Sequence, residues 1–237
     1  MGLFTIDRTI NFEEGKVKKV LNIIYSSNDD NEIENKMLEQ QIVNLRENTE
    51  QHGFFRRRWT TFLKDFCLYN YPNITELGKL YMNDSLTTKE VTLLVLVKRT
   101  VNINDELIRP LELILNVSKA LSDNNLDFEI TQKEFENALS HYKTNNYYEV
   151  NNIISVISKM RTDSSFEGEL STEPCHFDIW RNLLRTAGIS SSNNNIKVDC
   201  NQPIVRYIMN YYNDVPAANH NNYDFNDDFI RYIEFPT

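Results

Sequence analysis

One stretch of the chain, residues 53–68, combines a hydrophobic stripe with a run of arginines and constrains the fold more than any other. Its apolar side chains recur every three or four residues, which is the spacing of one face of a helix: Phe55, Trp59, Phe62, Leu63 and Phe66. Arg57, Thr61 and Lys64 share another face, flanked by Arg56, Arg58 and Thr60. We therefore predict an amphipathic helix with Trp59 in the core and with cations and hydroxyls on its other side.

Such a helix has two interpretations. A recognition helix in a nucleic-acid-binding domain presents basic groups to phosphates and small polar groups to base edges. An ordinary amphipathic helix with a basic solvent face has the same pattern. Three consecutive arginines cannot all face one way on a helix, so we expect Arg56 and Arg57 to bind the anion. We expect Arg58 to cap the helix or to pair with an acid.

The charge of the chain is unevenly distributed. Its 237 residues carry a net charge of −9, which argues against a protein that coats nucleic acid indiscriminately. Residues 51–110, however, hold nine basic and six acidic side chains. A segment with an excess of basic side chains, in a chain that is acidic overall, favours a localised anion site.

Several other chemistries are not indicated. The cysteines Cys67, Cys175 and Cys200 form neither a disulfide framework nor a zinc pattern, and the four histidines are scattered. No glycine-rich phosphate loop or nucleophile turn is present. We expect no catalytic residue, no metal ligand and no cofactor in this chain. We also expect no membrane segment and a cytoplasmic location.

Helical patterns dominate the order of elements. Helices are expected at 12–25, 32–50, 53–68, 76–83, 87–99, 110–121, 131–142 and 150–160. Capping boxes at Thr87–Glu90 and Thr131–Glu134 start two of them. We expect a turn at 69–73, directly after the helix at 53–68, because Pro72 is incompatible with a helix. Residues 101–106 are expected to be a connector.

The surroundings of the two tryptophans match. Trp59 to Leu68 aligns with Trp180 to Ile189 at a constant offset, and each segment is followed by a polar turn, an extended piece and a helix. The second copy places Arg181, Asn182 and Arg185 on its polar face. Asparagine binds adenine and arginine binds guanine through paired hydrogen bonds, so this helix is a candidate for reading bases. Ordinary solvent-facing side chains are the alternative.

We therefore predict a mainly α protein with two winged-helix-like subdomains, which carry short β wings and are joined by a helical linker region. The expected parts are an N-terminal helical arm, a first subdomain, connecting helices, a second subdomain and a C-terminal linker or tail. Their ranges are 1–52, 53–107, 108–162, 163–212 and 213–237.

About residues 53–212 resemble a known family. The succession Phe-Arg-Arg-Arg-Trp-x-x-Phe-Leu, Ile-Thr-Glu-Leu-Gly-Lys, Ile-Arg-Pro-Leu-Glu-Leu-Ile-Leu, Ile-Thr-Gln-Lys-Glu-Phe and Trp-Arg-Asn-Leu-Leu-Arg-Thr-Ala-Gly-Ile resembles the N-terminal part of AlwI-like type IIS restriction and nicking endonucleases. This resemblance implies a DNA-recognition region with winged-helix subdomains. In the family a separate C-terminal PD…(D/E)xK nuclease domain cuts outside the recognition sequence and uses a divalent metal such as Mg²⁺.

The chain departs from this family in lacking a recognisable nuclease core. Glu14-Gly-Lys16 is a Glu-x-Lys triplet, but Asp7 before it is too close in the chain and precedes no evident strand pairing. A nuclease site needs two carboxylates and a lysine that converge from neighbouring strands. We expect a recognition region, as a fragment or a specificity subunit, that binds double-stranded DNA and works with a separate nuclease domain or subunit. The alternatives are a protein–protein adaptor without nucleic-acid contact and a complete metal-dependent nuclease.

Overall fold

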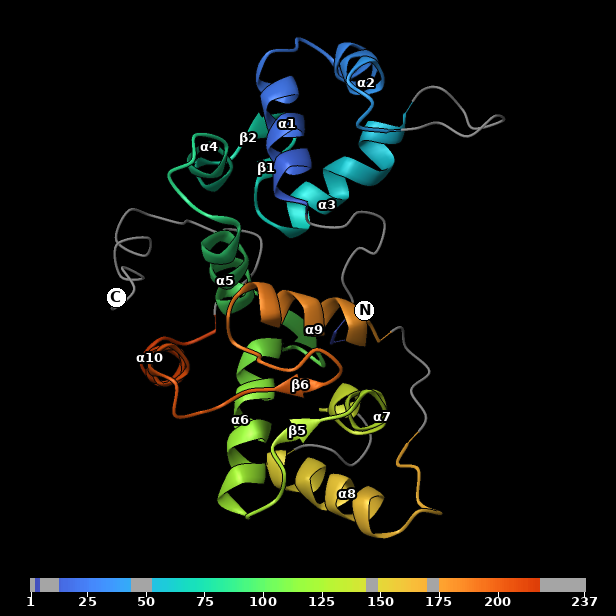
Figure 1. Cartoon of the computed structure of the whole chain (residues 1–237), viewed down its shortest axis with the longest axis vertical. Helices are drawn as coiled ribbons and strands as arrows, with labels where there is room; N and C mark the ends of the chain where they lie inside the picture. The colour runs from blue at the N-terminus through green and yellow to red at the C-terminus, as the bar shows by residue number, and fades with distance from the viewer. Residues whose placement is uncertain (1–2, 5–12, 44–52, 144–148, 170–174, 218–237) are drawn as a thin grey trace. The chain divides into compact units, whose positions relative to one another are not determined.

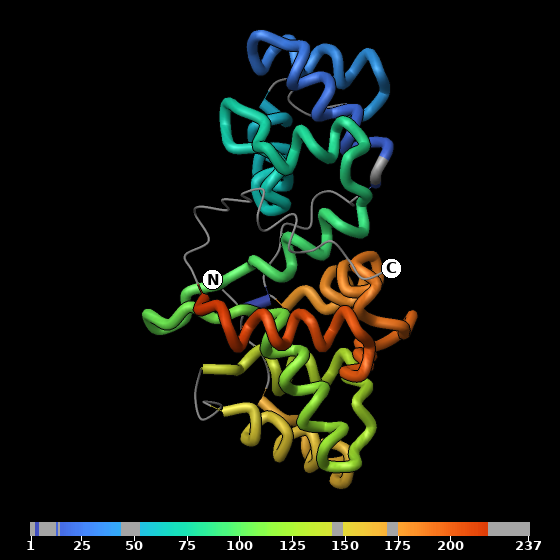
Figure 2. The backbone as a smooth tube through the Cα atoms, turned by 90° about the vertical axis from the view of Figure 1, so that its left-hand side faces the viewer, coloured from blue at the N-terminus to red at the C-terminus, as the bar shows by residue number. Residues whose placement is uncertain are grey.

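The computed structural model describes residues 3–4, 13–43, 53–143, 149–169 and 175–217. The predicted fold class is confirmed, because the described residues are mainly helical, with three short antiparallel strand pairs in a winged-helix-like order. The chain divides into two compact units. We call the described part of residues 7–91 the N-terminal unit. Residues 3–4 together with the described part of 92–217 form the C-terminal unit (Figures 1 and 2).

The N-terminal unit is built around α1 (Glu14–Tyr25), which packs against α2 (Asp30–Glu39), β2 (Asn73–Ile74) and α4 (Glu76–Met82). The predicted helix at 53–68 consists of a π-helical turn, η1 (Phe55–Trp59), followed by α3 (Thr60–Asp65). Strand β1 (Tyr69–Asn70) then pairs with β2 in a tight hairpin. The first turn of α5 (Thr88–Lys98) completes this unit.

The close approach of α4 to the end of α3 depends on a glycine. The Thr75 hydroxyl accepts a hydrogen bond from the Gly78 amide at 3.0 Å and donates one to the Cys67 carbonyl at 2.5 Å. A Cβ atom on Gly78 would lie 2.1 Å from the Leu68 carbonyl oxygen and 2.7 Å from Cγ2 of Ile74. The helix can therefore start at Thr75 only because residue 78 has no side chain.

The C-terminal unit contains the rest of α5 and a set of helices with two strand pairs. These elements are β3 (Val101–Ile103), β4 (Glu106–Ile108), α6 (Pro110–Asp123), β5 (Glu129–Ile130), α7 (Gln132–Asn137), the 3-10 turn η2 (Leu139–His141), α8 (Val150–Thr162), α9 (Phe177–Thr186), β6 (Ile196–Lys197) and α10 (Pro203–Asp214). Helix α6 packs against α8 and α10, and α7 packs against α9. Strand β5 pairs with the distant β6, as Figure 1 shows.

The prediction of a plain connector at 101–106 is wrong, because residues 101–108 form the β3–β4 hairpin. Its two-residue loop has Asn104 at φ 52° and Asp105 at φ 63°. Two successive residues with positive φ match the right-handed twist of a tight hairpin, and Asn and Asp tolerate this conformation best after glycine. The loop chemistry was readable in the sequence.

The first described residues belong to the C-terminal unit. Phe4 is 1% exposed and its ring packs edge-on against Trp180, with the centroids 5.4 Å apart. The indole N–H of Trp180 donates a hydrogen bond to the Phe4 carbonyl at 3.0 Å. The prediction that Trp59 is a core residue is confirmed, and Trp180 is buried as well.

The aligned tryptophan segments end in the same way, but so do other helices. In each, a residue with positive φ follows the helix, and the next amide donates to a carbonyl five residues back. The donor–acceptor pairs are Leu68 to Leu63 and Ile189 to Leu184, and also Ile42 to Met37, Ser85 to Leu80 and Leu126 to Leu121. This is the Schellman helix end. This ending is common in the protein, so it does not by itself distinguish a repeat, and the repeat stays a prediction.

The unit boundary lies inside α5, between Val91 and Thr92. The five-part division made from the sequence placed this whole helix in its first subdomain. That division is finer than the two compact units and stays a prediction. Most of the expected tail, residues 218–237, lies outside the described residues.

The close approach at Gly78 generates a prediction about stability. We expect Gly78→Ala to lower the free energy of unfolding by about 2 kcal/mol or more, because the added methyl group overlaps backbone atoms. Urea denaturation followed by circular dichroism measures the change. Gly15→Ala is the matched control, since nothing lies within 4 Å of a Cβ at this position in α1. It should stabilise the protein by about 0.5–1 kcal/mol, and equal effects of the two substitutions would contradict the packing described here.

Candidate nucleic-acid interface

All three arginines of the run 56–58 are exposed, while Phe55 and Trp59 on either side of them are buried. The π-helical turn accounts for this arrangement. A π turn closes with an i to i+5 hydrogen bond and so holds more residues than an α turn, and here the Thr60 amide donates to the Phe55 carbonyl. The wider turn spreads three consecutive side chains over the solvent side. All three arginines therefore reach solvent, and the expectation that they do not all face one way stays a prediction.

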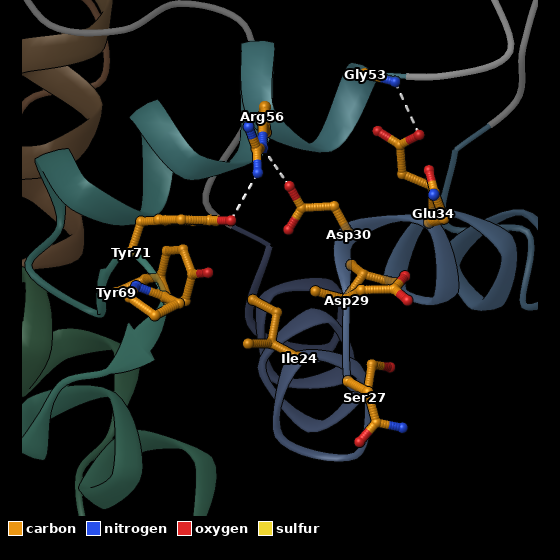
Figure 3. Close-up of a pocket in the computed structure, with 13 residues that line it drawn as sticks. Ile24, Ser27, Asp29, Asp30, Glu34, Gly53, Arg56, Tyr69 and Tyr71 are labelled. Atoms are coloured by element: carbon orange, nitrogen blue, oxygen red, sulfur yellow. Dashed lines mark hydrogen bonds and ion pairs between the residues drawn. The ribbon is translucent and has the colours of Figure 1, made fainter.

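The arginine that pairs with an acid is Arg56, and not Arg58 as expected. The Arg56 Nε donates to Oδ2 of Asp30, and Nη2 donates to the Tyr71 hydroxyl at 2.6 Å (Figure 3). Its guanidinium also lies 5.0 Å from the centroid of the Tyr71 ring. The Asp30 carboxylate raises the pKa of Arg56 above its usual value. Arg56 is thus held in place by α2 and by the β1–β2 hairpin.

The other predicted residues of this helix have different environments. The Arg57 Nε donates to the Gly53 carbonyl at 3.2 Å. The Thr60 hydroxyl donates to the Arg56 carbonyl, so it serves the helix backbone. Thr61 and Lys64 are exposed. Among the described residues neither Arg58 nor Lys64 lies within 4.0 Å of a carboxylate, which leaves both cations available to an external anion.

A buried carboxylate fixes the start of the helix formed by η1 and α3, which we call the basic helix. Glu34 on α2 is 1% exposed, and its two oxygens accept hydrogen bonds from the amides of Gly53 and Phe55, each at 2.8 Å. The first amides of a helix have no partner within it, and a negative charge near them is stabilising. Glu34 thereby ties the turn that carries the arginines to α2.

A hollow of about 430 Å³ lies between α2, the start of η1 and the β1–β2 hairpin (Figure 3). Its lining includes three carboxylates, but each one already has a partner. Asp29 caps α2 by accepting from the Glu32 amide, Asp30 holds Arg56, and Glu34 caps η1. Within the described residues no group of three or more His, Cys, Asp or Glu side chains has an arrangement that could hold a metal ion. Burial and the nearby Asp30 charge raise the pKa of Tyr69, which lines the same hollow, to about 12.

The second predicted set lies on α9 in the C-terminal unit. Arg181 pairs with Asp178 at 3.0 Å and donates to the Asn194 carbonyl at 3.2 Å, so it secures the loop that leads into β6. Asn182 and Arg185 are exposed. The predicted residues are therefore grouped as five on the basic helix and three on α9.

One exposed cation was missed by the sequence analysis. Helix α4, a five-residue turn and α5 follow one another as in a helix–turn–helix, whose second helix contacts bases with its N-terminal residues. Residues 91–97 of α5 are buried, as predicted, but Lys89 in its first turn is exposed. The signal was the capping box at Thr87, which the structure confirms with hydrogen bonds to Glu90 of 2.7 and 3.2 Å.

The Glu-x-Lys triplet lies on a helix, because Glu14 and Lys16 fall in the first turn of α1. Asp7 is outside the described residues. A helical turn does not provide the neighbouring strands on which a nuclease site of this kind is built. In the parts of the chain that the structure describes, no helix has the length and apolarity to cross a membrane.

No family model matches the sequence, and the search of curated proteins gave no match. A solved structure does match: the binding domain of the BpuJ1 endonuclease, crystallised in complex with pyrene- and phenanthrene-modified DNA. The TM-score is 0.67, with 16% sequence identity, and the match covers 98% of this chain and 93% of that chain. At this identity the likeness demonstrates a shared fold. The AlwI-like resemblance stays a prediction.

The cap at Glu34 can be tested by a nearly isosteric change. We expect Glu34→Gln to cost about 1–3 kcal/mol of unfolding free energy, because one buried amide then faces an N–H₂ group instead of an acceptor. Glu76→Gln is the control: this carboxylate is exposed and pairs with Lys79 in the same helix. Urea denaturation should leave the control unchanged, and an unchanged midpoint for Glu34→Gln would mean that the carboxylate does not hold the helix.

Proposed function

We propose that this chain binds double-stranded DNA sequence-specifically, as the recognition region of a restriction endonuclease. The observation that carries the proposal is the fold likeness to a DNA-bound endonuclease binding domain over nearly the whole length of both chains. The turn η1, with its exposed Arg56, Arg57 and Arg58, adds an independent chemical argument, since a duplex presents a dense row of phosphates. We call it the arginine turn.

The two helices have different roles in this proposal. On the basic helix, Arg56, Arg57, Arg58 and Lys64 contact phosphates and fix the register of the protein in a major groove, while Thr60 and Thr61 lie beside them. On α9, Asn182 and Arg185 read base edges at an adjacent site, and Arg181 supports the loop next to them. Phosphate contacts supply affinity and base contacts supply sequence preference.

The finer assignment rests on the resemblance to AlwI-like enzymes. In it, the chain is the recognition region or specificity subunit of a type IIS-like restriction or nicking endonuclease. The nuclease chemistry, with its Mg²⁺, belongs to another domain or subunit. The helical position of Glu14 and Lys16 is consistent with this separation of binding from cutting.

A salt titration tests the phosphate contacts. The wild-type protein should bind a random duplex with an affinity that falls as salt rises, with a slope of about −0.9 in log–log terms for each phosphate contact. Arg58→Gln and Lys64→Gln should each make this slope shallower by about 0.9. Lys119→Gln, which changes an exposed lysine paired with Asp123 on α6, is the control and should leave the slope unchanged. Fluorescence anisotropy with a labelled duplex gives these values.

The same titration distinguishes the basic helix from the helix–turn–helix. If Lys89→Gln makes the salt slope shallower while Arg58→Gln and Lys64→Gln do not, α5 faces the DNA instead of the basic helix. If the wild-type protein binds no duplex at low salt, the proposal fails and the adaptor alternative gains support. Sustained Mg²⁺-dependent cutting of plasmid by this chain would show that it contains its own active site.

Base reading by α9 makes a separate prediction. After selection from a random duplex pool, Asn182→Ala and Arg185→Ala should each relax the preference at one or two positions by about 1–3 kcal/mol of discrimination. Binding to random duplex should change little. Sequencing of the selected pools measures the base preference. Arg58→Gln is the control, which should weaken binding and leave the base preference unchanged. A uniform loss of affinity for the α9 variants would contradict the assigned role.

A further inference from the structure

The pairing of Arg56 has a feature that distinguishes it from the other arginines of the run. Arg56 shares its Nε–H with the Asp30 carboxylate, yet its side chain remains 62% exposed. The Asp30 side chain is more enclosed, at 22% exposed. The arginine thus has an internal anion on one side and solvent on the other.

We propose that Asp30 is a specificity-determining residue that competes with DNA phosphate for Arg56. This inference rests on the proposed function. The carboxylate occupies the guanidinium in free protein and in loose encounters with a duplex. A phosphate oxygen takes its place only when the other contacts hold the backbone against the turn.

The exchange is physically reasonable because the Arg56 guanidinium has an anionic hydrogen-bond acceptor in both states, the Asp30 carboxylate in one and a DNA phosphate in the other. Exposed ion pairs are weak, since water and salt screen them. A guanidinium accepts carboxylate and phosphate oxygens with the same planar geometry. A single small anion gains little over Asp30, whereas a duplex offers phosphates that several cations contact at once. Asp30 therefore penalises isolated contacts more than a complete interface.

Tyr71 keeps the arginine aligned during such an exchange. Its hydroxyl accepts from Nη2 at 2.6 Å, and its ring lies against the guanidinium (Figure 3). These two contacts do not involve the Nε–H that Asp30 occupies. When the carboxylate is displaced, the side chain stays in position and does not reorganise.

The other carboxylates around the hollow cannot take the same role. Asp29 and Glu34 accept backbone amides that start α2 and η1, and removing either would disturb a helix end. Asp30 lies at the first position of α2, and its described side-chain contact is the one with Arg56. The role of the Asp30 carboxylate is therefore to pair with a cation.

Neutralising Asp30 should strengthen binding to random duplex. Asp30→Asn should raise affinity by about fivefold to tenfold at 100 mM salt and steepen the log–log slope by about 0.9, because one more cation meets phosphate. Asp84→Asn is the matched control. It removes the same charge from the same unit, from a carboxylate paired with Lys18, and should raise affinity less than twofold.

A double-mutant cycle shows whether the gain passes through Arg56. In an Arg56→Gln background, Asp30→Asn should gain no more than Asp84→Asn does. Circular dichroism and thermal unfolding check that each variant folds. If Asp30→Asn does not fold, Asp30→Ser, which also suits a helix start, replaces it in the same cycle.

The outcomes separate the two proposals. Wild-type duplex binding with equal gains for Asp30→Asn and Asp84→Asn, a loss for Asp30→Asn, or a gain that persists without Arg56 overturns the role of Asp30 and leaves the proposed function standing. Absence of duplex binding at low salt for both the wild type and Asp30→Asn overturns the proposed function, and the inference with it.

Discussion

The bond between the buried Glu34 carboxylate and the amides of Gly53 and Phe55 is the interaction on which the basic helix depends. A charge this enclosed is costly unless hydrogen bonds satisfy it. Two helix-end amides do so and are themselves satisfied in return. Because Glu34 and Asp30 lie on the same short helix, α2 positions both the start of the arginine turn and the partner of its first arginine. The chemistry of the turn is thus set by a neighbouring helix.

Much of the secondary structure followed from periodicity, but the arginine turn did not. The spacing of Phe55, Trp59, Phe62 and Phe66 fits both an α-helix and a helix that begins with a π turn, since each places these rings inside. The polar side carries an exposed Arg58 and an Arg56 that pairs with Asp30. That pairing joins residues 26 positions apart, and no local pattern predicts it.

Tertiary contacts also explain some of the other errors. Phe4 has no periodic context, yet it is buried because its ring packs against those of Trp180 and Phe135. The β3–β4 hairpin, by contrast, is encoded locally by Asn104 and Asp105, whose positive φ angles suit a two-residue loop even without glycine. Of the three candidates on α9, Asn182 and Arg185 lie on an exposed face as predicted. Arg181 pairs with Asp178 in the same helix.

Under the proposed function, this acidic protein recognises a polyanion and must limit its contacts to the intended site. The net charge of −9 opposes indiscriminate binding at long range, but salt screens such repulsion beyond about 10 Å. Close to the duplex, selectivity has to come from the immediate surroundings of each cation. A carboxylate that shares an arginine with solvent acts at that short range. On this argument Asp30 beside the arginine turn complements the proposed function, since affinity from Arg58 and Lys64 would be useful only if partial contacts remain weak.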